Sequence, residues 1–219
     1  MFRYEKPQAG RVREHEQVGC EVLGSELAIV DAEVIAIQAG IYRDLGLPDL
    51  TLHLNSVGSP EARVAYREAL VAYLTPFASE LDEDSQQRHA TNPLRILDSK
   101  SPRTREIVAG APTLPDFLTE QDRAHFAEVR ALLDAAGVSY VVDPMLVRGR
   151  DYYARTVWEF SSTALGAQSA VGGGGRYAGH VRQIGRPAPP AGGIGSGIQR
   201  RVLCPEALAA AAPGAAFAA

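Results

Sequence analysis

Polar and apolar residues alternate at the two ends of the chain, whereas helical spacing dominates its middle. Over residues 11–23 the odd positions from 11 to 21 carry charged, histidine, amide or glycine residues, and the even positions include Val12, Val18, Cys20 and Val22. This period of two predicts a strand whose polar set shares one face. A loop over residues 6–10 precedes it. Further extended segments are predicted over residues 2–5, 50–57, 139–143, 145–148 and 155–160.

Three longer segments have the residue spacing of amphipathic helices. The first covers residues 25–46 with Ser25 as its N-cap, and the second covers residues 60–86. The third covers residues 120–136 and stops at a glycine. Prolines divide the chain between the second and third into short helices. The apolar stripe predicted for the first helix consists of Leu27, Val30, Val34, Ile37 and Ile41.

Strands at both ends with helices between them predict an α+β fold. We expect a mainly antiparallel sheet with flanking helices and an inserted helical subdomain. Residues 1–58 and 139–203 then form the two parts of the core, and residues 59–138 form the inserted helical subdomain. An Ala-rich disordered tail is expected over residues 204–219.

Composition narrows the class of protein. The chain has 219 residues, of which 46 % are apolar and 22 % charged, so it is globular rather than disordered. No apolar run approaches the roughly 20 residues of a membrane span, and the first residues lack the apolar core of a signal peptide. Two cysteines are too few for a disulfide scaffold or a zinc site, so a cytoplasmic setting is expected. The net charge of −4 excludes a uniformly basic nucleic-acid binder, although residues 22–140 are acidic and residues 141–203 basic.

The first candidate site is a cluster of arginines on the two N-terminal strands. Arg3 lies on one strand, and Arg11 and Arg13 lie on one face of the next. Converging guanidinium groups repel each other unless an anion lies among them, and phosphate is the natural partner. The alternative is that neighbouring carboxylates neutralise them as surface ion pairs, from Glu5, Glu14 and Glu16.

A second candidate follows on the same strand. Gln17 and Glu21 lie four residues apart on one face, with Gly19 between them. An amide oxygen and a carboxylate over a bare residue can hold an ammonium group, such as the α-amino group of an amino acid. An exposed polar strand face is the alternative.

A third candidate is the glycine-centred turn over residues 146–153. It carries Arg148, which can stabilise developing negative charge, and Tyr152 and Tyr153, whose hydroxyls can orient a polar ring. The alternative is that both tyrosines are half-buried packing residues.

Two glycine-rich segments, 172–175 and 192–197, would let the backbone come close to a flat ligand. The second is expected to open a final helix at Ile198, with Arg200 in its first turn, which suits a nucleotide phosphate. A glycine-rich hinge is the alternative. The first segment lacks the βαβ context of a dinucleotide-binding fold, and the five histidines lack metal-ligand spacing.

Together these segments resemble the catalytic core of the histidyl-tRNA synthetases, a family of class II aminoacyl-tRNA synthetases. Residues 2–21 resemble motif 2, and residues 146–153 resemble the histidine-specific signature of the family. Residues 173–177 resemble its second histidine-binding segment, and residues 195–200 resemble motif 3. Residues 92–100 are similar to its inserted helical region.

The resemblance implies ATP-dependent activation of histidine to histidyl-adenylate and transfer to tRNA(His), with Mg²⁺ accompanying ATP. Arg3 and Arg148 are the implied catalytic residues: Arg3 holds the α-phosphate, and Arg148 stabilises charge while the histidine carboxylate attacks. The implied ATP-binding residues are Arg3, Arg11, Arg13 and Arg200. The implied histidine-binding residues are Gln17 and Glu21 at the α-amino group, and Arg148, Tyr152, Tyr153 and Tyr177.

Four positions depart from the family pattern: Arg150, Ala178, Gln199 and Arg201. The chain also begins within motif 2, so we expect motif 1, which builds the homodimer interface of the family, and the anticodon-binding domain to be absent. Weak or no activity and an exposed apolar face that favours self-association are expected. Two alternatives stay open: a non-catalytic regulatory subunit of histidine biosynthesis, and a truncated product of a decaying gene.

Overall fold

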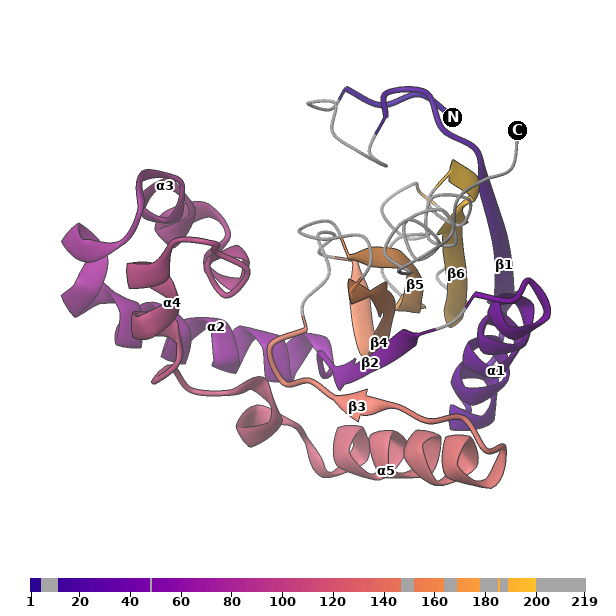
Figure 1. Ribbon diagram of the computed structural model, residues 1–219. Coiled ribbons are helices and arrows are strands. Elements are labelled where there is room, and N and C mark those ends of the chain that lie inside the picture. The colour runs from indigo at the N-terminus through magenta and orange to yellow at the C-terminus, as the bar shows by residue number, and fades with distance from the viewer. Residues whose placement is uncertain are drawn as a thin grey trace, which may run out of the picture.

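A six-stranded sheet forms the centre of the structure, which is a computed structural model (Figure 1). It describes residues 1–4, 12–47, 49–146, 152–163, 169–177, 185 and 189–199. The strand order is β1-β6-β5-β4-β2-β3, and every pairing is antiparallel except the parallel pair β2 and β3. The expected α+β fold with a mainly antiparallel sheet is confirmed. The strands are β1 (Gln17–Leu23), β2 (Leu50–Ser56), β3 (Val141–Val142), β4 (Tyr153–Ser162), β5 (Ala170–Tyr177) and β6 (Ala191–Gly197).

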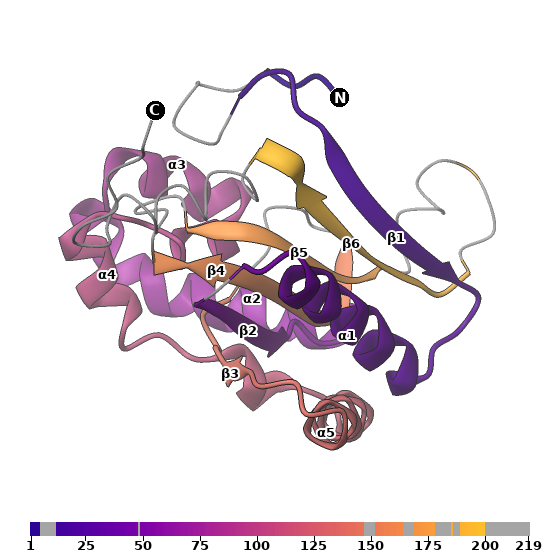
Figure 2. The ribbon, with the colours of Figure 1, turned by 45° about the vertical axis from the view of Figure 1, so that its right-hand side comes forward.

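Two helices, α1 (Ala28–Asp44) and α5 (Glu120–Ala135), pack on one face of the sheet (Figure 2). Apolar side chains from both helices meet Leu54 and Trp158 of the sheet in one core. The described helices leave the opposite face open. We call these the covered face and the open face.

The buried side of α1 differs from the predicted apolar stripe. Leu27 is 66 % exposed and Ile37 is 42 % exposed, whereas Asp31 and Gln38 are each 1 % exposed. The buried Gln38 side chain has a hydrogen-bond partner, because its Oε1 accepts from Trp158 Nε1 at 2.8 Å. The helix also begins at Ala28, with Leu27 as N-cap, so the predicted N-cap at Ser25 is wrong by two residues.

The other helices lie beside the sheet, at the left of Figure 1, and all of them except Glu83–Thr91 contribute apolar side chains to a second core. They are α2 (Pro60–Leu74), η1 (Thr75–Glu80), α3 (Glu83–Thr91), η2 (Pro93–Ile96), α4 (Pro102–Val108) and η3 (Leu114–Phe117). We call them the helical group. The single helix predicted over residues 60–86 is wrong, because Pro76 falls in a 3-10 turn and Asp82 then caps a new helix. The domain boundaries at 59 and 138 stay a prediction.

Three strand predictions also need correction. β1 begins at Gln17, and Arg13 lies in a bend ahead of it. The segment ahead of β1 meets the first residues of the chain at an isolated bridge between Phe2 and Glu14. Within the strand expected over residues 139–143, Val141–Val142 is a strand, and a turn follows at residues 144–145. The end of the strand expected over residues 145–148 lies outside the described residues. Both glycine-rich segments lie inside strands, β5 and β6, rather than in a hinge. The tail after residue 199 lies outside the described residues.

Candidate functional site

The open face brings together four of the predicted histidine-binding residues. Tyr177 of β5 donates its hydroxyl to Glu21 Oε2 of β1 at 2.6 Å, although β6 lies between the two strands. Tyr153 of β4 lies opposite Tyr177 in the strand pairing. The ring centroids of Tyr152 and Tyr153 are 4.7 Å apart, and those of Tyr152 and Tyr177 are 5.8 Å apart. A carboxylate therefore faces an aromatic wall of three tyrosines.

Bare glycine backbone explains how these side chains cross the sheet. A Cβ at Gly193 of β6 would collide with the Glu21 carboxylate, and a Cβ at Gly175 of β5 would lie 2.5 Å from Tyr153 Cδ1. The side chains of Glu21 and Tyr153 thus occupy the space that side chains on β5 and β6 would fill. The glycine segments are expected to let the backbone come close to a flat ligand. In the structure, side chains of the protein itself come close to this bare backbone.

Gln17 lies on the same face as Glu21, farther along β1. A Cβ at Gly195 would lie 2.6 Å from its amide nitrogen, so its side chain also leans over β6. Both Gln17 and Glu21 are exposed. The predicted polar face of this strand is confirmed from Gln17 onward.

The electrostatics of the pair keep its proton on the tyrosine. Burial and the Glu21 carboxylate both raise the pKa of Tyr177 above its usual range. Tyr177 therefore stays a donor at neutral pH. A carboxylate has about four acceptor positions, so Glu21 can accept from Tyr177 and also from a cationic or N–H group of a ligand.

A buried ionic cluster lies behind the wall, on the covered face. Arg176 is 4 % exposed and its Nη2 lies 2.7 Å from Asp31 Oδ1, while His125 Nε2 lies 2.8 Å from Asp31 Oδ2. Arg176 also donates to the carbonyl oxygens of Ser25 and Leu27. Burial acts to raise the pKa of Asp31, but hydrogen bonds from His125 and Arg176 outweigh it and hold that pKa below its usual range. Sequence reasoning missed this cluster, because Asp31, His125 and Arg176 lie far apart along the chain.

Two of the predicted phosphate-binding arginines lie near each other. The Arg3 backbone N–H donates to Arg13 O at 2.8 Å, and Arg3 Nε donates to Val12 O at 3.0 Å. The Arg13 guanidinium carbon lies 5.3 Å from the centroid of the Tyr4 ring. Other predicted or departing residues lie outside the described part of the chain: Arg11, Arg148, Arg150, Ala178, Arg200 and Arg201.

Gln199, one of the departures from the family pattern, is described. Its Oε1 accepts from the Glu16 backbone N–H at 3.3 Å, and the neighbouring Ile198 N–H donates to Glu16 O at 3.0 Å. The end of β6 is thereby tied to the start of β1. The neutral amide of Gln199 thus contributes to the contact between the end of β6 and the start of β1.

The described residues hold no group of three histidine, cysteine, aspartate or glutamate side chains that could bind a metal ion. Mg²⁺ is normally bound through one or two carboxylates together with substrate phosphates. Within the same part of the chain, no helix has the length and apolar character needed to cross a membrane.

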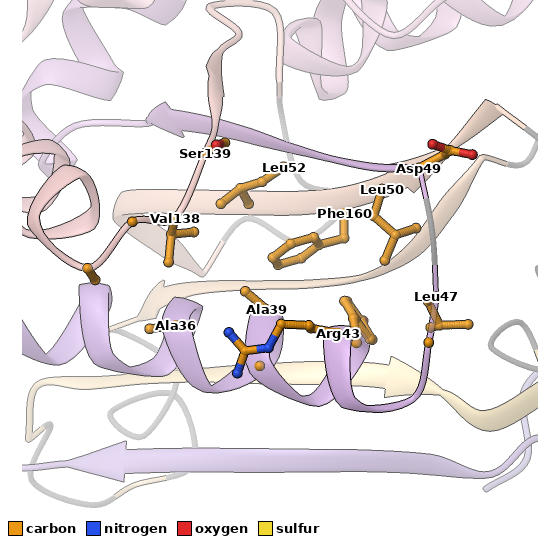
Figure 3. Close-up of a pocket in the computed structure, with 15 residues that line it drawn as sticks. Ala36, Ala39, Arg43, Leu47, Asp49, Leu50, Leu52, Val138, Ser139 and Phe160 are labelled. Atoms are coloured by element: carbon orange, nitrogen blue, oxygen red, sulfur yellow. The ribbon is translucent and has the colours of Figure 1, made fainter.

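A separate hollow of about 620 Å³ lies on the covered face (Figure 3). Helix α1 lines it with Ala39 and Arg43, and the sheet lines it with Leu52 and Phe160. Its described lining contains none of the residues predicted to bind ATP or histidine. Among the described residues, this hollow is therefore separate from the candidate site on the open face.

Comparison with known proteins decides the family. Residues 1–199 match the family model described as Histidyl-tRNA synthetase. The chain belongs to the histidyl-tRNA synthetase family. It is 54 % identical to the histidine–tRNA ligase of Thermosynechococcus vestitus over 203 residues, which are 93 % of this chain and 47 % of that protein. The chain thus spans about half the length of the curated relatives it matches.

Solved structures agree with this family. The crystal structure of apo Staphylococcus aureus histidyl-tRNA synthetase matches with a TM-score of 0.74 and 36 % identity, over 95 % of this chain and 49 % of that one. A Bacillus halodurans structure described as an ATP phosphoribosyltransferase regulatory subunit/histidyl-tRNA synthetase matches with a TM-score of 0.59 and 22 % identity, over 91 % of this chain and 55 % of that one. That second match shows the fold alone, so it does not favour the regulatory alternative.

Proposed function

We propose that this chain carries the histidine-activating site of a histidine–tRNA ligase. It would bind histidine and ATP and form histidyl-adenylate, which the whole ligase transfers to tRNA(His). The observation that carries this proposal is the Glu21–Tyr177 hydrogen bond beside Tyr152 and Tyr153 on the open face. A carboxylate at the edge of an aromatic wall suits a ligand that has an ammonium group and a flat polar ring.

Different residues recognise the two ends of histidine. Gln17 and Glu21 hold the α-amino group, because an ammonium donates to amide and carboxylate oxygens. Tyr153, with Tyr152 and Tyr177, forms the surface against which the imidazole packs. Glu21 accepts from Tyr177 and so connects the amine end of the site to its ring end.

ATP recognition rests on the arginines. Arg3 and Arg13, with Arg11 and Arg200, bind the phosphates, since guanidinium forks match phosphate oxygens. Part of the phosphate charge would be neutralised by Mg²⁺ bound to ATP. A bond forms between a histidine carboxylate oxygen and the α-phosphorus while the bond to pyrophosphate breaks. Arg148 stabilises the negative charge at that centre, so catalysis is positioning plus electrostatics, without a covalent enzyme intermediate.

The setting follows from the substrates. We propose a cytoplasmic setting, which is compatible with charging of tRNA(His) for protein synthesis. In the whole ligase we propose the homodimer typical of the family.

The test is ATP–pyrophosphate exchange with the purified chain and all twenty amino acids in parallel. We expect exchange with histidine alone, at a rate well below that of a full-length ligase. Glu21→Gln and Tyr177→Phe should both weaken histidine binding, measured by calorimetry. Binding of another amino acid in preference to histidine, or histidine binding that is indifferent to both substitutions, would overturn the proposal.

A further inference from the structure

The start of β4 is held by the helical group as well as by the sheet. Arg63, one turn into α2, donates through Nη1 to the backbone oxygen of Tyr153. At this place the pairing of β4 with β5 is irregular, with a register shift between Tyr153 and Val157. After the pair of Tyr153 with Tyr177, the regular pairing of β4 with β5 is therefore interrupted until Val157.

Arg155 lies inside this irregular stretch with a φ of 55°, a left-handed conformation that is uncommon for a residue other than glycine. Its N–H donates to Gly58 O at 2.8 Å, and its carbonyl accepts from Val57 N–H at 2.7 Å. Its guanidinium Nε lies 3.6 Å from Asp122 Oδ1 of α5. Such backbone conformations persist where surrounding contacts fix them, and here those contacts come from residues next to α2 and within α5.

Asp122 joins the two helices at this point. It is 1 % exposed, and its Oδ2 accepts from the backbone N–H of Ser59 at 3.1 Å and of Thr119 at 3.3 Å. These two residues are the N-caps of α2 and α5. The starts of both helices and the irregular stretch of β4 thus share one buried carboxylate.

The aromatic wall has free space behind it. A cavity of about 680 Å³ is lined by Arg63, Arg155 and Arg176 together with Tyr152 and Ala154. The cavity borders Tyr152 and Ala154, the neighbours of Tyr153 in the chain. The hydrogen bond from Arg63 is one described contact that holds the Tyr153 backbone at this place.

We propose that Arg63 is a positioning residue for the histidine pocket: it holds the Tyr153 backbone from α2, so that the Tyr153 ring lies on bare Gly175 beside Tyr152. The pocket geometry is then coupled to the helical group through one guanidinium. This inference rests on the proposed function for its effect on histidine, but its structural part can be read without any ligand.

The test compares Arg63→Met with Arg67→Met in the full chain. Arg67 is exposed, lies one turn farther along α2 and is the same residue type, so it is the matched control. The first readout is fluorine NMR of chain labelled with 3-fluorotyrosine, with the Tyr153 signal assigned by Tyr153→Phe. The second is calorimetry with histidine alone and with ATP alone.

We expect Arg63→Met to shift the Tyr153 signal and to raise the histidine Kd roughly tenfold, while the ATP Kd stays within about twofold. Arg67→Met should change none of these, and Arg63→Lys should restore part of the histidine affinity. An unshifted Tyr153 signal in Arg63→Met, or an equal loss of both ligands, overturns the proposal. A shifted signal in a chain that binds no histidine at all supports the positioning role and refutes the proposed function instead.

Discussion

On the covered face of the sheet Arg176 points into the protein, whereas Tyr177, the next residue of β5, points to the open face. Arg176 meets Asp31, which is also bonded to His125, so every member of that cluster is paired within the chain. Tyr177 meets the exposed carboxylate of Glu21. The covered face uses its polar groups to hold α1 and α5 on the sheet, and the open face leaves acceptor capacity for a ligand. Substitution of Arg176 should therefore lower mainly the stability of the fold, whereas substitution of Tyr177 should mainly weaken ligand binding.

The largest effect is expected from Arg176→Met. Removing one partner of a buried ion pair leaves Asp31 without its main counter-charge, which typically costs about 3–5 kcal/mol. Tyr177→Phe removes only a hydroxyl at an accessible site, so the free energy of unfolding should fall by roughly 1 kcal/mol. The histidine Kd should instead rise about tenfold, which corresponds to 1.4 kcal/mol.

Urea unfolding measures the free energy of unfolding of both variants, and calorimetry measures their histidine Kd. Arg176→Lys is the control that keeps the charge but loses the guanidinium fork, and it should fall between the parent and Arg176→Met. Equal unfolding free energies for Arg176→Met and Tyr177→Phe would show that the two faces do not differ in this way.

A smaller contrast is expected between two glycines of neighbouring strands. A Cβ at Gly174 would lie 2.6 Å from Trp158 Cζ2 and would collide with the Gly193 carbonyl, so Gly174→Ala overpacks the core. Overpacking costs about 1–3 kcal/mol, and more where backbone must move. A Cβ at Gly195 meets only the exposed amide of Gln17, which can swing away.

Gly195→Ala should therefore leave the unfolding free energy within about 0.5 kcal/mol of the parent. Its histidine affinity should fall several-fold, because the Gln17 amide is displaced. Glycine-to-alanine substitution should thus lower the stability on the covered face and the histidine affinity on the open face. Thermal melts measure the first effect, and histidine titrations measure the second. A Gly174→Ala variant as stable as Gly195→Ala would contradict the packing described for Trp158.

The sequence pattern predicts the open face better than the covered one. Polar alternation from Gln17 to Glu21 places both side chains on one face, and that face carries the candidate site. On α1, the predicted apolar stripe contains neither Asp31 nor Gln38, yet both are buried, and their partners lie more than a hundred residues away on β4 and β5. Likewise, runs of glycine have low strand propensity, and the side chains that fill their space come from other elements.

The smallest effect concerns the outer side of α1. Helical periodicity predicts Ile37 in the apolar stripe, yet it is 42 % exposed, whereas Ile35 is 0 % exposed. Ile37→Ala should change the unfolding free energy by no more than about 0.5 kcal/mol, because little burial is lost and alanine is the better helix former. Ile35→Ala, the matched substitution two residues away, should cost about 2–5 kcal/mol through the cavity it leaves. If Ile37→Ala were as costly as Ile35→Ala in urea unfolding, a partner would have to cover this side of α1 in solution, and sedimentation of the parent chain would then show self-association.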